Sequence, residues 1–170
     1  MQGWYGYCVN NNKRDGQSVE SDPMTFQNDP DLIRWKLHLQ SSPQTVYQIL
    51  ATDEGRASFW AESAVEKDGF IHFVFPNQAE WKGKILEQES PLKFKVDYYG
   101  GSITTFELAA DGDGGTDLTL TDQGVLGEDR TEVIAGWVSV LMALKASVDY
   151  GVDLRNHDME HTWDEGYCEN

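Results

Sequence analysis

A long run of alternating apolar and polar side chains, from about Ser63 to Asp122, limits the possible folds more than any other feature of this sequence. Alternation with a period of two is typical of strands that bury one face. No helical pattern separates the consecutive strands, so the run predicts an antiparallel meander with one covered face. The turns between strands are expected at Asp68-Gly69, Asn77-Gln78, Ser90-Pro91, Gly100-Gly101 and residues 111–115.

The residues before this run predict one more strand and two short helices. Residues 33–39 alternate in the same way as the later strands. Ser42 and Pro43 then form a helix start, with a capping hydroxyl followed by proline at the first helical position. Thr52 starts a second short helix that reaches Trp60. Such short helices need a larger surface to pack on, so we expect them at an edge or end of the sheet.

A long helix is predicted from Asp129 to Tyr150. Asp129 with Glu132 three residues later is a capping pattern, and Gly151 is a typical stop. One long helix on one curved sheet of six or seven antiparallel strands is an α+β, two-layer arrangement. The apolar stripe expected to face the sheet contains Val133, Ile134, Trp137, Val138, Leu141, Leu144 and Val148.

The domain is expected to span residues 32–154, between an N-terminal tail of residues 1–31 and an acidic C-terminal tail of residues 155–170. Order in the tails would come from aromatic anchors docked on the domain, and deleting residues 1–30 and 155–170 is expected to leave folding intact. Cys8 and Cys168 are too few for a disulfide framework and are expected to be free thiols. The candidate anchors are Trp4, Tyr5, Tyr7, Trp163 and Tyr167.

The charge of the chain disfavours two classes of partner. Thirteen Lys and Arg residues stand against 29 Asp and Glu residues, a formal net charge of −16. Such a field repels phosphate backbones and anionic lipid headgroups, so we expect neither nucleic acid binding nor membrane insertion. The N-terminal residues lack a basic leader followed by an apolar run, and a cytoplasmic location is therefore expected.

Four segments resemble the START-like, or SRPBCC, superfamily: residues 41–53 with Trp60, residues 81–91, residues 114–121 and residues 136–151. They are most similar to the subgroup named after the activator of the heat-shock protein 90 ATPase. This resemblance implies the helix-grip fold, a curved antiparallel sheet wrapped on a long C-terminal helix. The superfamily includes lipid carriers, hormone receptors and polyketide cyclases, so the resemblance alone does not determine function. The chain departs from it in having only Asp68-Gly69 where a glycine pair is usual.

Residues 157–161 read His-x-x-Glu-His, the order of an inverted zinc-protease motif. The motif lies after the helix stop Gly151 and shows no third ligand nearby, so we expect less than stoichiometric zinc, no metal site and no cofactor. His38 and His72 lie on the polar phase of their strands, which makes neither a good general base. No acid–base pair stands out at an inward position.

The remaining candidate site is a set of side chains expected between sheet and helix, where they could line a hydrophobic cavity. Polar contacts to a ligand would come from Tyr98, Thr104 and Glu87, and Gly83→Leu is expected to block the cavity at a cost of about 1–3 kcal/mol. The candidate ligand-binding residues are Trp60, Phe73, Phe75, Trp81, Phe94, Tyr98, Thr104, Phe106, Trp137 and Leu141.

Three classes of function are compatible with these features. The first is a small-molecule binding protein for an apolar or aromatic ligand. The alternative is a protein-interaction module that modulates a chaperone or another partner, as the name of the subgroup implies. A cyclase- or hydrolase-type enzyme is the less favoured third class. A ligand carrier needs an apolar void of several hundred Å³, whereas an interaction module can have a solid core and an exposed apolar patch.

Overall fold

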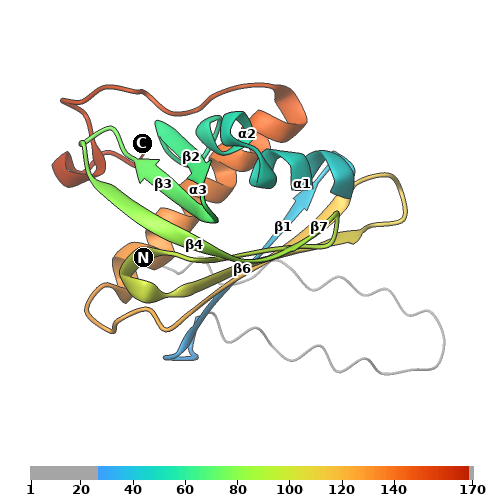
Figure 1. The fold of residues 1–170 in the computed structure, drawn as a ribbon, viewed down its shortest axis with the longest axis horizontal. Coiled ribbons are helices and arrows are strands. Elements are labelled where there is room, and N and C mark those ends of the chain that lie inside the picture. Colours follow the sequence, from blue (N-terminus) through green and yellow to red (C-terminus); the bar gives the residue numbers. More distant parts are fainter. Residues whose placement is uncertain (1–26, 169–170) are drawn as a thin grey trace, which may run out of the picture.

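The computed structural model describes residues 27–168, which form one curved sheet around one long helix (Figure 1). The expected α+β architecture is confirmed, with seven strands. In chain order the elements are β1 (Leu32–Leu39), α1 (Pro43–Ala51), α2 (Asp53–Ala57), β2 (Ser63–Lys67), β3 (Phe70–Val74), β4 (Glu80–Glu89), β5 (Lys93–Asp97), η1 (Tyr99–Gly101), β6 (Ile103–Ala110), β7 (Thr116–Gln123), α3 (Arg130–Tyr150) and η2 (Trp163–Glu165).

The sheet is antiparallel throughout, with the order β1-β7-β6-β5-β4-β3-β2. Strands β2 to β7 follow the chain as a meander, and β1 pairs with β7 along its whole length. The glycine-rich stretch between β6 and β7 is a hairpin loop, as expected. Its shape is held by the Asp111 carboxylate, which accepts hydrogen bonds from the main-chain N–H groups of Asp113 at 2.8 Å and Gly115 at 2.9 Å.

The two short helices pack at one end of the sheet and are held there by a buried arginine. Ser42 caps α1 and Thr52 caps α2, as their sequence predicts. The fully buried guanidinium of Arg56 donates from Nε to the carbonyl of Ala64 at 3.0 Å and from Nη1 to the carbonyl of Leu50 at 3.2 Å. Because Leu50 is in α1 and Ala64 is in β2, these bonds tie the helix pair to the sheet.

Helix α3 lies across the inner face of the sheet (Figure 1) and departs from the expected pattern in two ways. The Asp129 side chain makes no capping hydrogen bond. Val138 was expected on the sheet side but is 41% exposed, next to Met142 on the outer face, whereas Val140 is buried. The helix is apolar on more than one side, so periodicity could not assign a single buried stripe.

By length and composition alone α3 could also cross a membrane, a test that core helices of soluble proteins pass as well.

The segment after α3 turns back and runs along the domain to the side of α3 where the helix begins (Figure 1, red). Its main anchor is Arg155, a side chain in the stretch expected to be tail. The Arg155 guanidinium donates to the carbonyls of Ala61 at 2.7 Å and Ala57 at 2.5 Å, and it forms an ion pair with Asp153 at 2.6 Å. We call residues 152–168 the C-terminal strap. The expected anchors Trp4, Tyr5 and Tyr7, and also Cys8, lie outside the described residues.

Candidate functional site

The core beneath the candidate site is a solid cluster of aromatic rings centred on Trp60. The Trp60 ring is fully buried and lies 5.1 to 5.9 Å, centroid to centroid, from the rings of Phe73, Tyr98, Phe106 and Trp137. Its Nε1 donates to the Tyr98 hydroxyl at 3.0 Å. Burial raises the pKa of Tyr98, which keeps the hydroxyl protonated. These rings therefore pack against one another beneath the pocket.

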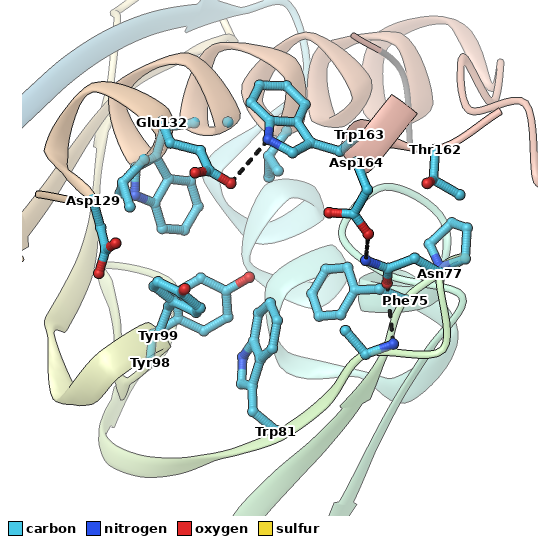
Figure 2. A pocket seen from close by; sticks show the side chains of 16 residues that line it. Phe75, Asn77, Trp81, Tyr98, Tyr99, Asp129, Glu132, Thr162, Trp163 and Asp164 are labelled. Atoms are coloured by element: carbon cyan, nitrogen blue, oxygen red, sulfur yellow. Dashed lines mark hydrogen bonds between the residues drawn. The ribbon is translucent and has the colours of Figure 1, made fainter. Parts of the chain in front are cut away.

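A pocket of about 340 Å³ lies beside this cluster, between α3, the strands β3 to β5 and the C-terminal strap (Figure 2). It is partly open to solvent. Six aromatic side chains contribute to its wall, and the strap supplies part of the opposite side. The pocket is lined by Phe75, Pro76, Asn77, Ala79, Trp81, Tyr98, Tyr99, Asp129, Glu132, Val133, Gly136, Trp137, Val140, Thr162, Trp163 and Asp164.

The rings of the pocket wall support one another. Phe75 and Trp81 stack with centroids 4.1 Å apart, and Tyr98 and Tyr99 meet the Trp81 ring at 69° and 64°. Trp81 Nε1 is buried and makes no hydrogen bond to the described residues. Ring contacts therefore hold Trp81 in place. Across the pocket, Trp163 Nε1 donates to Glu132 at 3.0 Å and Asn77 donates to Asp164 at 2.7 Å, the two dashed bonds that fasten the strap in Figure 2.

The structure places the ten expected ligand-binding residues in two groups. Phe75, Trp81, Tyr98 and Trp137 line the pocket. The others are buried in the core behind it and are not among the lining residues: Trp60, Phe73, Phe94, Thr104, Phe106 and Leu141. Glu87 lies away from the pocket and pairs with Lys93 at 3.2 Å on a neighbouring strand. A register shift in β4 between Ile85 and Glu87 interrupts the simple alternation there.

Three parts of the pocket were missed by sequence reasoning. Tyr99 lies in the turn after β5, and the acidic residues Asp129 and Glu132 were interpreted only as a helix cap. Trp163 was named as an anchor, but nothing in the sequence linked it to the pocket. Trp163 is far from the sheet strands along the chain, so no local sequence pattern could connect it to them. The signal that was available is the pair of aromatic residues Tyr98 and Tyr99 directly before a glycine turn.

A buried carboxylate, Asp122, lies behind the Trp137 ring. It is 1% exposed, and it accepts hydrogen bonds from Trp137 Nε1 at 2.8 Å and from the Thr104 hydroxyl at 3.1 Å. Burial raises the pKa of Asp122, while these hydrogen bonds act in the opposite direction. The sequence did carry a signal for it, because Asp122 shares the inward phase of Leu118 and Leu120 in β7. Asp122 thus positions the Trp137 ring of the pocket wall.

The Asp122→Asn variant tests whether Asp122 is a buried carboxylate with a raised pKa, because such a group makes the stability of the protein depend on pH. Because the folded-state pKa lies above the ordinary value of 3.8, the folded state holds the proton more tightly than the unfolded state. The wild type therefore loses stability as pH rises from about 4 through the raised pKa. We expect the stability of Asp122→Asn relative to wild type to increase over that window in urea unfolding. The exposed Glu107→Gln should show no such trend, and an equal trend in both variants would contradict the assignment.

The His-x-x-Glu-His residues lie on the exposed side of the strap and not on a helix. His157 approaches Glu62 at 2.6 Å and Asp153 at 3.1 Å, and His161 approaches Asp158 at 2.7 Å. An inverted zinc-protease motif needs both imidazoles on one helix face, and this segment does not supply that geometry. Among residues 27–168 no group of three or more metal-ligating side chains comes together.

Solved structures similar to this chain share its fold. A protein from Staphylococcus saprophyticus is 24% identical, with a TM-score of 0.63, and the match covers 73% of this chain and 96% of that one. The Aha1 dimer from Colwellia psychrerythraea is 20% identical, with a TM-score of 0.63, and the match covers 71% and 97% of the two chains. An AHSA1-like protein from Aeromonas hydrophila is 16% identical, with a TM-score of 0.61 and coverages of 71% and 93%.

A comparison with curated proteins finds no relative of this chain. The family model for activator of Hsp90 ATPase homolog 1-like proteins matches residues 40–149, which is more than half of the sequence. The matched region runs from the turn after β1 almost to the end of α3 and leaves the strap outside. The chain therefore belongs to the activator of Hsp90 ATPase homolog 1-like family, which has the helix-grip fold and includes ligand-binding and Hsp90-ATPase-activating proteins.

Proposed function

We propose that this protein binds a small ligand with an apolar or aromatic body in the pocket between α3, β3 to β5 and the strap. The observation that carries the proposal is the aromatic wall of a pocket of about 340 Å³. Small-molecule sites are typically concave, about 300–1,000 Å³ in volume and lined mainly by apolar and aromatic side chains. A solid core without such a wall would have favoured the interaction module.

Gly136→Leu is expected to abolish binding of the neutral fluorescent probe N-phenylnaphthylamine without harming the fold. Gly136 is in α3 and lines the pocket, and a Cβ placed there meets no atom within 4 Å. A leucine side chain would therefore occupy the ligand space. Removing a glycine from a helix interior stabilises the helix by about 0.5–1 kcal/mol, so the melting temperature should hold or rise.

The matched control for this experiment is Ala135→Leu. Ala135 is the neighbouring residue of α3 and is exposed; it does not line this pocket but a second one, of about 480 Å³, on another side of the helix, so the control also shows whether the probe binds there. This variant adds the same kind of bulk on another side of the helix, and it should bind the probe as the wild type does. Probe binding that survives Gly136→Leu, or a wild type that binds no probe, would contradict the proposed pocket function.

A second candidate function, interaction with an Hsp90-type chaperone, is favoured by a different surface. Val138 and Met142 on the outer face of α3 are 41% and 43% exposed, Leu154 of the strap is 52% exposed, and the three line one shallow hollow together. Exposed apolar side chains gathered in this way are typical of protein-binding surfaces. Stimulation of the ATPase of a purified Hsp90 that is lost in Met142→Lys but kept in Gly136→Leu would support this function.

A further inference from the structure

The pocket has an acidic rim, formed by Asp129 and Glu132 at the start of α3 and by Asp164 in η2 (Figure 2). None of the described residues that line the pocket is Lys, Arg or His. The positive end of the α3 dipole amounts to about half an elementary charge, which is less than the charge of three carboxylates. The rim therefore has a net negative charge.

The carboxylates of this rim retain acceptor capacity. Glu132 accepts one hydrogen bond at Oε1 from Trp163, and Asp164 accepts one at Oδ2 from Asn77. Each keeps its second oxygen available. The Asp129 side chain makes no hydrogen bond or ion pair with the described residues.

The arginine nearest to the rim in sequence donates its hydrogen bonds to main-chain carbonyls and not to the rim carboxylates. Arg130 follows Asp129 directly, but its Nη2 donates to the main-chain carbonyls of Gln27, Asp29 and Leu32. It is thus held at the start of β1. Arg155 of the strap is bound to Asp153 and to the carbonyls of Ala57 and Ala61. The described arginines on both sides of the pocket are already bound elsewhere.

The aromatic wall, like the acidic rim, favours a cation over an anion. The π faces of tryptophan and tyrosine are electronegative and attract cations held near the ring. The pocket contains three tryptophans, Trp81, Trp137 and Trp163, and two tyrosines, Tyr98 and Tyr99. Trp81 meets both tyrosines at steep angles, so the rings form walls facing in different directions. A wall of this kind and an acidic rim would both oppose an anion.

We propose that the ligand of this pocket is an organic ammonium ion whose apolar or aromatic body lies against the rings while its charged nitrogen meets the acidic rim. This proposal rests on the proposed ligand-binding function and specifies its chemistry. A volume of about 340 Å³ suits a molecule with one ring system. Binding needs no metal and no covalent step.

The test compares three probes of one shape on the full chain: benzyltrimethylammonium, its neutral carbon isostere neopentylbenzene and the anion benzylsulfonate. Binding is followed by tryptophan fluorescence and calorimetry. The cation should bind about tenfold more tightly than the isostere, the anion should bind least, and the preference should weaken as salt is raised. Equal affinity for cation and isostere, or preference for the anion, would overturn this inference and leave the pocket function intact.

The Glu132→Gln variant separates the effect of the rim's charge on cation affinity from the effect of the pocket's shape. Glutamine keeps an acceptor for Trp163 Nε1 and nearly the same volume, so the variant should lose about fivefold in affinity for the cation and nothing for neopentylbenzene. Glu107→Gln, which removes one exposed carboxylate on β6, is the control for net charge and should bind all three probes as wild type does. Equal affinity of Glu132→Gln and wild type for the cation would contradict the role of the rim. No binding of any probe, with no difference between wild type and Gly136→Leu, would instead contradict the proposed function itself.

Discussion

Replacing Gly83 by leucine is expected to lower the free energy of unfolding by about 4 kcal/mol or more, which is a large part of the stability of a typical domain. Gly83 is buried in β4. A Cβ at this position would lie 2.5 Å from the main-chain oxygen of Asp97, 2.9 Å from a methyl group of Val96 and 3.2 Å from the Phe73 ring. The oxygen belongs to the end of β5 and cannot move without disturbing the sheet.

This result would differ from the one that the sequence suggests. Alternation places Gly83 on the inward phase, from which a leucine was expected to fill a cavity at modest cost. The structure corrects that expectation, because Gly83 faces β5 and Phe73 and does not line the pocket. The measurement is urea unfolding of Gly83→Leu beside Gly136→Leu, which adds the same side chain at an open position. Equal stability of the two variants would contradict the close packing around Gly83.

Arg155→Ala is expected to cost about 3 kcal/mol, because it leaves one buried and one half-buried carbonyl without their charged donor. The carbonyls are those of Ala57 and Ala61, and the Arg155 side chain is 4% exposed. The exposed Arg34→Ala is the matched control and should change stability by less than about 0.5 kcal/mol. Arg155→Lys should recover only part of the loss, since an ammonium cannot donate in the fork geometry of a guanidinium.

The same contact gives a pH dependence. Hydrogen bonds from Arg155 lower the pKa of Asp153 to about 2 from an ordinary value of 3.8. This carboxylate therefore stabilises the fold above about pH 4, and the contribution is lost as pH falls towards 2. The difference in unfolding free energy between wild type and Arg155→Ala should shrink over that window. A constant difference would show that the ion pair adds nothing to the hydrogen bonds with the carbonyls.

Arg155 also bears on where the domain ends. A chain cut after Leu154 was expected from the sequence to fold unchanged, but it would lack Arg155 and the pocket residues Thr162, Trp163 and Asp164. We now expect this truncation to destabilise the protein about as much as Arg155→Ala. Faster proteolysis of the strap in Arg155→Ala than in Arg34→Ala would show the loosening directly. Wild-type stability of the truncated chain would contradict the anchoring role.

The sequence by itself determined the elements and their order. Alternation marks the strands because side chains on a strand point to opposite faces with a period of two. The turns at Asp68-Gly69 and Gly100-Gly101, the cap at Ser42 and the stop at Gly151 depend on local backbone preferences, so they can be predicted without tertiary information. The seven-stranded sheet around α3 agrees with these elements and with the family resemblance.

Only the tertiary structure decided which aromatic residues fill the core and which line the pocket. Alternation assigns Phe73 and Phe75 to the same face, yet Phe73 is fully buried while Phe75 borders the pocket, because depth depends on what lies opposite. The rim combines Asp129 and Glu132 with Asp164, a residue brought there by the strap. The strap in turn is held by Arg155, a charged residue that composition alone assigns to solvent. Contacts between such distant parts of the chain arise from packing and have no local sequence pattern.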